Sequence, residues 1–202
     1  MTRATHTRGR AIIEPEFLLA GYSAGYFPMA DSRNGEVRWY SPALRGIIPL
    51  DEFKVTRSLS QTLRKETFGV KFNTSFEAVV RACAGREDTW ISEEIVQSYL
   101  RLHLLGYAHS VEAWKEGVLA GGLYGVALGA AFFGESMFSR ERDASKVALV
   151  HLVERLRKRK FELLDTQFVT PHLARFGTIE IPRSDYLVRL RNAIGKKRSF
   201  AG

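Results

Sequence analysis

The most constraining feature of this sequence is an uncharged, glycine-rich run of 18 residues that extends from Gly117 to Gly134. Its length is that at which a membrane-spanning helix has to be considered. Six of its residues are glycines, however, and glycine weakens a helix. Two apolar stretches separated near residues 125–129 are instead typical of two buried strands joined by a turn. The flanking charges also lack the aromatic and basic pattern that anchors a membrane segment, so we expect strands and no membrane.

The charge balance favours a polyanionic partner. The chain of 202 residues carries 30 Lys and Arg against 22 Asp and Glu, which gives a net charge of +8. Cys83 is the only cysteine, so no intramolecular disulfide can form, and a reducing, cytoplasmic location is expected. Residues 1–10 are basic and polar with no apolar stretch behind them, which does not resemble a secretory signal.

Hydrophobic periodicity and the Gly and Pro residues predict the secondary structure. Before residue 85 we expect a helix, a loop rich in aromatic rings, a strand and a second helix, at 15–22, 25–42, 70–73 and 76–84. A boundary is expected near residues 85–88. After it we expect helices and strands in the order helix, three strands, helix, strand, helix, strand, helix, at 92–106, 110–115, 118–126, 130–136, 143–160, 161–167, 172–176, 178–181 and from 184 onward.

This succession predicts an α+β fold in two parts. Residues 1–85 form a small N-terminal lobe, and residues 86–202 form a catalytic domain with a mostly antiparallel sheet. The order of elements in the second part resembles the GNAT class of acyltransferases, in which an acyl donor lies where the sheet splays. Fold likeness alone does not assign a function.

Asp165 and Gln167 are candidate catalytic residues, because alternate side chains of a strand share one face. A carboxylate there can hold a neighbouring amide so that the amide oxygen faces a substrate N–H. The alternative is that the strand emerges into solvent and that both residues lie on the surface.

Three further charged residues follow the glycine-rich run. Glu135 follows the glycine-rich run, where partial desolvation favours recognition of a cation, although a solvated loop is the alternative. Asp143 suits the N-cap of the long helix. Lys146 projects from the first turn of that helix, where a nearby phosphate would offset the unfavourable dipole interaction, although an exposed lysine is the commoner situation.

Basic residues gather at the end of the long helix and at the end of the sequence. Some of this charge complements the C-terminus of a helix. The excess suggests a surface that follows phosphates. The residues concerned are Arg155, Arg157, Lys158, Arg159 and Lys160, together with Lys196, Lys197 and Arg198.

Other types of site have no support in the sequence. The five histidines show no metal-ligand spacing with one another or with Cys83, so we expect no metal. A P-loop, a dinucleotide-binding fingerprint and a G-x-S-x-G elbow are all missing, so we expect neither a cofactor nor an activated nucleophile. The chemistry then has to rely on positioning the reactants.

Several long strings in the chain resemble successive motifs of the leucyl/phenylalanyl-tRNA-protein transferase family. They occur in the family's order from about residue 17 to residue 186 and read FLLAGYSAGYFP, WYSPALRG, TWIS, LHLLGYAHSVEAW, GGLYGVALGAAFFGESMFSRERDASKVAL, LLDTQ and HLARFGTIEIPRSDY. The resemblance implies a bacterial cytoplasmic enzyme of the N-degron pathway. It would move Leu or Phe, and less readily Met, from aminoacyl-tRNA to the N-terminal Arg or Lys of an acceptor protein, without a metal or coenzyme.

By position, the resemblance also implies roles for individual residues. Asp165 and Gln167 match the family's catalytic pair, and Glu135 matches an acidic residue of the acceptor cleft. Met29, Leu123 and Phe132 match the pocket for the donor side chain, and Trp90 matches an aromatic residue beside the tRNA terminus. The family usually has Phe-Pro-Trp where this chain has Met29, which leaves the preference among Leu, Phe and Met open.

Two other functions remain open on the sequence. An acyl-CoA-dependent N-acetyltransferase fits the order of elements, although the chain lacks an Arg/Gln-x-x-Gly-x-Gly/Ala loop for the pyrophosphate. A non-catalytic RNA-binding protein fits the basic residues. Transfer of an amino acid from charged tRNA to a peptide that begins with Arg would separate these functions.

Overall fold

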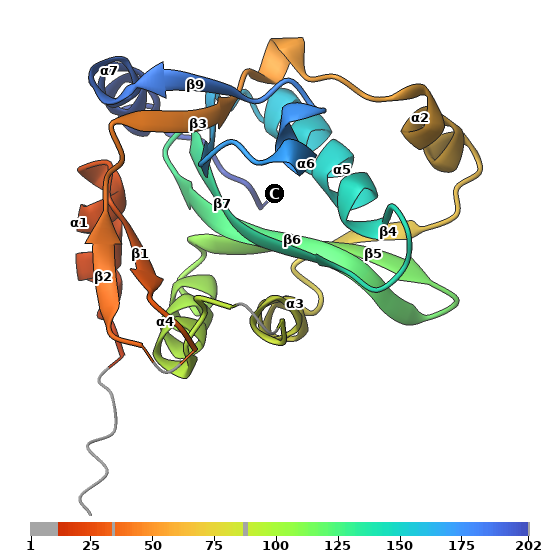
Figure 1. The fold of residues 1–202 in the computed structure, drawn as a ribbon, viewed down its shortest axis with the longest axis horizontal. Helices are drawn as coiled ribbons and strands as arrows, with labels where there is room; N and C mark the ends of the chain where they lie inside the picture. Colours follow the sequence, from red (N-terminus) through yellow and green to blue (C-terminus); the bar gives the residue numbers. More distant parts are fainter. Residues whose placement is uncertain (1–11, 34, 87–88, 202) are drawn as a thin grey trace, which may run out of the picture.

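The computed structural model describes residues 12–33, 35–86 and 89–201, and these form helices on both faces of a mixed sheet (Figure 1). The helices are α1 Pro15–Ser23, α2 Arg57–Arg64, α3 Phe76–Ala84, α4 Glu93–Leu104, α5 Ala144–Lys158, α6 Pro171–Ala174 and α7 Arg183–Ile194. The strands are β1 Phe27–Ala30, β2 Val37–Tyr40, β3 Leu44–Ile48, β4 Gly69–Phe72, β5 Ala108–Lys115, β6 Val118–Leu128, β7 Ala131–Ser139, β8 Leu163–Gln167 and β9 Ile179–Pro182. These elements confirm the predicted α and β composition and most of the predicted order.

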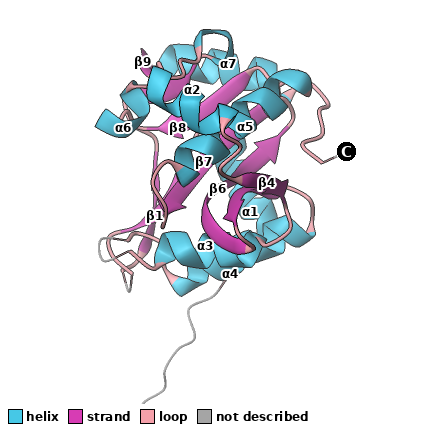
Figure 2. Cartoon of the chain, turned by 90° about the vertical axis from the view of Figure 1, so that its right-hand side faces the viewer, coloured by secondary structure: helices cyan, strands magenta, loops and turns pink. Residues whose placement is uncertain are grey.

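The main sheet has seven strands in the order β4-β5-β6-β7-β8-β3-β9. All neighbouring pairs are antiparallel except β7 and β8, which are parallel. Helix α5 packs on β5, β6 and β7 from one side, and α3 packs on the same strands. The helices α3 and α4 lie together on the face opposite α5 and α6 (Figures 1 and 2).

The glycine-rich run forms most of β6, the turn after it and part of β7, as the sequence predicts. Within the described residues, the structure contains no helix with the length and apolarity that a membrane crossing requires. Two glycines of the run stand where the structure leaves no space for a Cβ atom. A Cβ on Gly121 would lie 2.6 Å from the Ala144 Cβ, and one on Gly125 would lie 2.2 Å from the Phe133 carbonyl oxygen. Small residues therefore let α5 and the neighbouring strand approach β6 closely.

The segment expected to be a loop, residues 25–42, is instead largely a hairpin. Strands β1 and β2 pair in antiparallel register, so the prediction of a loop was wrong. The predicted Asn34-Gly35 turn includes Asn34, which lies outside the described residues. Of the aromatic rings in this segment, Phe27 is buried and Trp39 and Tyr40 are half-buried, whereas Tyr26 is exposed. The Trp39 ring meets Phe17 edge to face at 5.3 Å, and Phe27 meets Phe168 in the same way at 5.7 Å.

Strands from both halves of the chain share the main sheet. Strands β3 and β4 come from residues 1–85, and they pair with strands that follow residue 86. A division at residue 85 therefore does not follow the hydrogen bonding of the sheet, and the two-part description stays a prediction. Residues 87–88 of the expected boundary lie outside the described part, as do residues 1–10.

The parallel pair opens the sheet at its centre. Strand β7 pairs with β8 only from Ala131 to Phe133, opposite Leu163 to Asp165. Beyond this point β7 continues to Ser139, but it makes no further ladder contact with β8. The sheet therefore splays where Glu135 and Gln167 leave the paired region.

A buried carboxylate fixes the helix that flanks this opening. The Glu112 side chain on β5 is fully buried and accepts hydrogen bonds from the backbone N–H groups of Thr74 and Ser75, each at 2.8 Å. The hydroxyl of Ser110 donates to the same carboxylate at 2.8 Å. Burial raises the pKa of Glu112, but these hydrogen bonds outweigh it and lower the pKa overall. The start of α3 is thereby tied to the sheet.

Candidate active site

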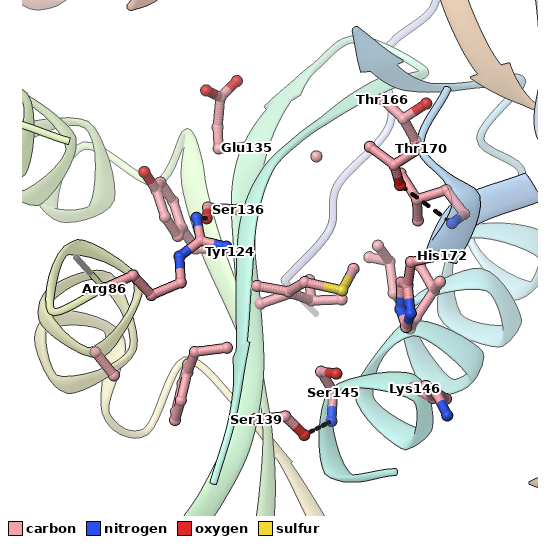
Figure 3. A pocket seen from close by; sticks show the side chains of 18 of the residues that line it. Arg86, Tyr124, Glu135, Ser136, Ser139, Ser145, Lys146, Thr166, Thr170 and His172 are labelled. Carbon is pink, nitrogen blue, oxygen red and sulfur yellow. Dashed lines mark hydrogen bonds between the residues drawn. The ribbon is translucent and has the colours of Figure 1, made fainter. Parts of the chain in front are cut away.

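A cavity of about 1290 Å³ lies in the splay between β7 and β8. The first turns of α5, the residues after β8 and one side of α3 complete its wall. Figure 3 shows Arg86, Tyr124 and Ser136 on one side of β7, and Thr166, Thr170 and His172 on the other. The cavity is large enough for an amino-acid side chain together with part of a nucleotide and a peptide end.

The floor of the cavity is apolar. It is lined by Leu123, Met137, Leu149, Leu152, Leu164 and Leu173. Met29 and Trp90 also line the cavity, and both side chains are half-buried. Of the three residues expected in a donor side-chain pocket, the structure thus brings Met29 and Leu123 to the cavity.

Phe132 does not line this cavity, contrary to the expectation for the donor pocket. Its ring is fully buried and packs against Phe200 at 5.3 Å. Phe132 and Leu123 belong to the same core cluster. The reason is packing, because Phe200 and other residues of this cluster enclose the Phe132 ring, while Phe133 faces the other side of the sheet, toward Tyr22 at 4.7 Å. Phe132 is therefore part of the core and not of the cavity wall.

Asp165 is completely buried and faces Arg45 on β3. The guanidinium binds the carboxylate in a bidentate manner, with Nε to Oδ1 at 2.9 Å and Nη2 to Oδ2 at 2.7 Å. The hydroxyl of Tyr186 on α7 donates to Oδ2 at 2.6 Å. Burial is the largest single influence on the pKa of Arg45 and lowers it, but the charge and hydrogen bonds of Asp165, with the charges of Tyr186 and Glu135, together raise the pKa. The pair is a fully paired charge cluster in the interior.

Gln167 lies at the end of β8 in an unusual backbone conformation. Its φ is 60°, and the N–H of Phe168 reaches back to the Thr166 carbonyl oxygen at 2.6 Å. This is the hydrogen bond of a γ-turn centred on Gln167, and the form with positive φ is rare and strained. The Gln167 N–H donates to Asp165 Oδ1 at 2.8 Å, which holds the turn in place.

The structure gives the Asp165 and Gln167 side chains different surroundings, and their role as a catalytic pair stays a prediction. The positive φ at Gln167 departs from the regular geometry of a strand. Gln167 lines the cavity and Asp165 does not. The Asp165 carboxylate holds the backbone of Gln167, while the side-chain Nε2 of Gln167 lies 3.5 Å from Glu135 Oε1.

Glu135 lies in the cavity wall among tyrosines. The Tyr22 hydroxyl donates to Oε1 at 2.7 Å, and the Tyr99 hydroxyl donates to Oε2 at 3.0 Å. The two hydroxyls also contact each other. Burial raises the pKa of Glu135 to about 7, although both tyrosine hydrogen bonds oppose this shift. Among the described residues, no ion pair joins Glu135 to a cation of the chain.

Sequence reasoning missed four residues of these clusters, namely Arg45, Tyr186, Tyr22 and Tyr99. Each lies far from its partner in the chain, with separations of 120 residues for Arg45 and Asp165 and 113 for Tyr22 and Glu135. No local pattern shows which carboxylate a distant side chain will meet. All four lie in or beside apolar stretches, which was the one indication that their polar groups would be buried.

The start of α5 differs from the expected capping. Asp143 is at the N-cap position, but its φ of 68° directs the side chain away from the helix N–H groups, and its carboxylate accepts from Lys146 Nζ at 2.6 Å instead. The Ser139 hydroxyl accepts from the Ser145 N–H at 3.2 Å, as Figure 3 shows. Lys146 does line the cavity, as its expected role near a phosphate requires.

The basic end of α5 does not line the cavity. Arg155 donates to the Phe200 carbonyl oxygen at 2.8 Å and lies over the rings of Phe72 and Phe200. Arg157 donates to the Leu50 carbonyl oxygen at 2.7 Å. These two side chains thus hold neighbouring segments of the chain, which the charge pattern could not show. Lys158 is exposed and Arg159 is half-buried.

The structure offers no group of three His, Cys, Asp or Glu residues that could hold a metal ion within its described part. His172 lines the cavity, and burial lowers its pKa, with Lys146 and Arg175 adding to the shift. Its imidazole is therefore neutral near pH 7.

Comparison with known proteins gives a consistent result. Residues 47–191 match the family "Leucyl/phenylalanyl-tRNA protein transferase", and residues 12–43 match that family's N-terminal domain. The leucyl/phenylalanyl-tRNA–protein transferase of Chlorobaculum parvum is 53% identical over 193 residues, which covers 94% of this chain and 100% of the relative. The protein of the same name from Paramagnetospirillum magneticum is 55% identical over 190 residues, covering 92% and 91%.

Among solved structures, the protein described as L-PGS from Bacillus licheniformis is 14% identical, with a TM-score of 0.42 over 81% of this chain and 56% of that chain. That likeness is too distant to support the fold or the function. The two family matches and the close relatives together cover the cavity, Glu135 and the buried Asp165. The chain therefore belongs to the leucyl/phenylalanyl-tRNA–protein transferase family.

Proposed function

We propose that this enzyme transfers Leu or Phe, and less readily Met, from aminoacyl-tRNA to the N-terminal Arg or Lys of acceptor proteins. The observation that carries the proposal is the pair formed by Gln167 and Glu135, 3.5 Å apart, at the wall of a cavity with an apolar floor. The apolar floor can then hold the donor side chain, and the wall that carries Glu135 can hold a cationic acceptor. The reaction class follows from family membership.

The apolar floor selects the donor. A Leu or Phe side chain buried against Leu123 and Met137 leaves no polar group unpaired, whereas a polar side chain would lose its water there. One methylene group is discriminated by only about 1 to 3 kcal/mol in such a pocket, so some transfer of Met is expected. The flexible Met29, which stands where the family usually has Trp, makes this wall more adaptable.

Glu135 selects the acceptor. The carboxylate is bound by two tyrosines but has no ion-pair partner in the described residues, so a cationic side chain can complete its environment. An N-terminal Arg or Lys supplies that charge. Its α-amino group, with an ordinary pKa of about 7.7 to 8, is partly neutral near pH 8 and therefore able to act as a nucleophile.

The reaction is direct aminolysis of the ester. The acceptor nitrogen attacks the carbonyl carbon of the aminoacyl ester, the new C–N bond forms, and the bond from carbon to the 3′ oxygen of tRNA breaks. One proton passes from the amine to the departing oxygen. The Gln167 carbonyl oxygen accepts a hydrogen bond from the amine and holds it in line with the ester. Asp165 acts by fixing the Gln167 backbone.

The tRNA terminus would enter beside Trp90 and Lys146, which both line the cavity. Trp90 offers a ring for stacking, and Lys146 offers a charge for phosphate. Lys158 and Arg159 remain candidates for contacts farther along the tRNA. Arg155 and Arg157 are bound to carbonyl oxygens of the chain itself, and we propose that they support this surface.

The splayed sheet also supports the GNAT-like description, because the cavity occupies the position where that class holds its acyl donor. We assign the enzyme to the cytoplasmic N-degron pathway, in which the added Leu or Phe marks the acceptor for degradation. This assignment follows the family resemblance and the acceptor chemistry of Glu135.

The test is transfer of a labelled amino acid to a peptide. The protein is incubated with tRNA charged with Leu, Phe, Met or Val, and with peptides that begin with Arg, Lys or Gly. We expect labelling in the order Leu or Phe, then Met, then Val, and only on the Arg and Lys peptides. Equal labelling of the Gly peptide would contradict the proposed acceptor, and equal use of Val would contradict the donor pocket.

Two further incubations address the alternative functions. Acetyl-CoA replaces charged tRNA in the first, and an acetylated peptide would support an N-acetyltransferase instead. In the second, binding of charged tRNA is followed with no peptide present. Binding without any transfer to any peptide would support the non-catalytic RNA-binding alternative.

A further inference from the structure

Arg45 lies between the N-terminal helix and the strand that carries Gln167. Its Nη1 donates to the Gly25 carbonyl oxygen at 3.2 Å, directly after α1, while Nε and Nη2 bind Asp165. Nη2 also lies 3.3 Å from the Tyr186 hydroxyl oxygen. The side chain is 1% exposed. Every nitrogen of the guanidinium is therefore engaged inside the protein.

Two aromatic rings hold the guanidinium in addition to its hydrogen bonds. The Arg45 Cζ lies 4.6 Å from the centre of the Phe27 ring and 4.5 Å from the centre of the Tyr186 ring. Phe27 belongs to β1, Tyr186 to α7 and Asp165 to β8, so three parts of the chain converge on one cation. A planar guanidinium suits this position, because it can stack on rings and bind a carboxylate with two parallel hydrogen bonds.

The same carboxylate holds the strained turn at Gln167. Asp165 Oδ1 receives both the Arg45 Nε–H and the Gln167 N–H, so one oxygen atom joins the cation to the turn. The positive φ at Gln167 has a conformational cost, and it persists only where surrounding contacts fix it. A small rotation of the Asp165 carboxylate would release the Gln167 N–H, and the Gln167 side chain would then move within the cavity.

We propose that Arg45 is a positioning residue for the transfer reaction, which sets the orientation of Gln167 through the Asp165 carboxylate without touching substrate. The proposal rests on the proposed role of Gln167. It also gives the N-terminal helix a part in catalysis, because the end of α1 contacts the same guanidinium. Arg45 does not line the cavity, so its removal leaves the donor and acceptor contacts in place.

The experiment measures single-turnover transfer of Leu from charged tRNA to a peptide that begins with Arg, with enzyme in excess. At enzyme concentrations that saturate the charged tRNA, the rate constant of a single turnover does not depend on the fraction of enzyme that is active, so partial unfolding does not imitate the effect. Arg45→Lys keeps the charge but loses the bidentate contact. We expect its rate constant to fall by roughly 10- to 100-fold, with less than about a threefold change in the affinity for charged tRNA.

A double-mutant cycle with Asp165 provides the second arm. Arg45→Gln combined with Asp165→Asn leaves no uncompensated charge, and we expect it to react at the same rate as Asp165→Asn alone. All variants are assayed below their unfolding temperatures. The matched control is Arg101→Lys, since Arg101 forms an exposed ion pair with Glu14 at 3.1 Å, and this variant should react as the wild type does.

The outcomes separate the two proposals. A wild-type rate for Arg45→Lys would overturn the positioning role, and so would a double variant much slower than Asp165→Asn. If Arg45→Lys does not fold, the double variant still decides the question. Failure of the wild-type protein to label any peptide would instead contradict the proposed function itself.

Discussion

One fully buried and one half-buried carboxylate lie on either side of Gln167, and their surroundings differ in one respect. Asp165 is bound by tyrosine Tyr186 and by the cation of Arg45. Glu135 is bound by tyrosines Tyr22 and Tyr99 but by no cation among the described residues. The first cluster is complete within the protein, and it can serve as a fixed support. The second is incomplete in charge, and it is suited to receive a cation from a substrate.

The difference also appears in the electrostatics. Burial raises the pKa of Glu135 to about 7, and the tyrosine hydrogen bonds only partly oppose it. At Arg45 the charge and hydrogen bonds of Asp165, together with the charges of Tyr186 and Glu135, outweigh the effect of burial on the pKa. A paired buried charge resists change because removing either partner leaves the other without compensation. An unpaired one changes its protonation readily when a ligand arrives.

The largest expected effect comes from breaking the complete cluster. Asp165→Asn leaves the Arg45 cation buried without its counter-charge, and we expect a loss of about 3 to 5 kcal/mol in the free energy of unfolding. Urea unfolding at pH 7 measures it. Glu135→Gln provides the contrast, since it removes no ion pair and should not destabilise the protein. Equal losses for the two variants would show that the clusters do not differ in this way.

The next effect concerns the residue between the clusters. Gln167→Ala removes the amide that faces the cavity, and we expect single-turnover transfer to fall by roughly 100-fold, in the range typical for a positioned catalytic group. The affinity for charged tRNA should stay within about threefold, because the donor floor is unchanged. Filter binding and transfer assays measure the two quantities. Unchanged turnover would exclude Gln167 from the mechanism.

Glu135→Gln sharpens the comparison through pH. Between the ordinary glutamate pKa of about 4.3 and the folded pKa of about 7, the folded state holds a proton that the unfolded state has released. The stability of the wild type therefore falls as pH rises through this window, and it changes no further above it. Glu135→Gln lacks this decline. The melting temperature of the variant minus that of the wild type should therefore increase from pH 4 to pH 8.

The same variant should weaken recognition of the acceptor. We expect the KM for a peptide with N-terminal Arg to rise by roughly 10-fold at pH 8, the magnitude of one lost charge interaction in a partly desolvated site. Other titratable or charged groups act on Glu135 as well, and the variant leaves them in place; these are Tyr22 of α1, Arg45 of β3, Tyr99 of α4, Tyr124 of β6 and Asp165 of β8. An unchanged KM would mean that Glu135 does not bind the acceptor.

The smallest effect lies outside both clusters. Leu123→Ala enlarges the apolar floor, and we expect the ratio of Phe to Leu transfer to shift toward Phe by a few-fold to about 10-fold. Competition between the two charged tRNAs measures this ratio. Because neither carboxylate is altered, the pH dependence of transfer should match that of the wild type. Phe132→Leu, in the core next to Phe200, is the matched control and should leave the ratio nearly unchanged.

Most helices and most strands could be predicted from the sequence because their patterns are local, but helix α2 at Arg57–Arg64 and strand β3 at Leu44–Ile48 were missed. The long helix α5, the strands of the glycine-rich run and the exact bounds of α3 follow from periodicity and from Gly and Pro. The β1–β2 hairpin was missed, since prolines and aromatic rings at 25–42 are equally typical of a loop. Glu135 was predicted from its place directly after the glycine-rich run and Gln167 from strand alternation, but no local pattern showed that these two side chains would meet.

The sequence by itself pointed to the two carboxylates and the amide, to the uncharged run that ends directly before Glu135 and forms buried strands, and to the family of the chain. Only the tertiary structure decided that Asp165 turns inward to Arg45 while Gln167 turns out to the cavity, and that Phe132 and Arg155 pack within the protein. The physical reason is that a buried charge must find its partner wherever the fold provides one. For Asp165 that partner is 120 residues away, beyond the reach of any local pattern.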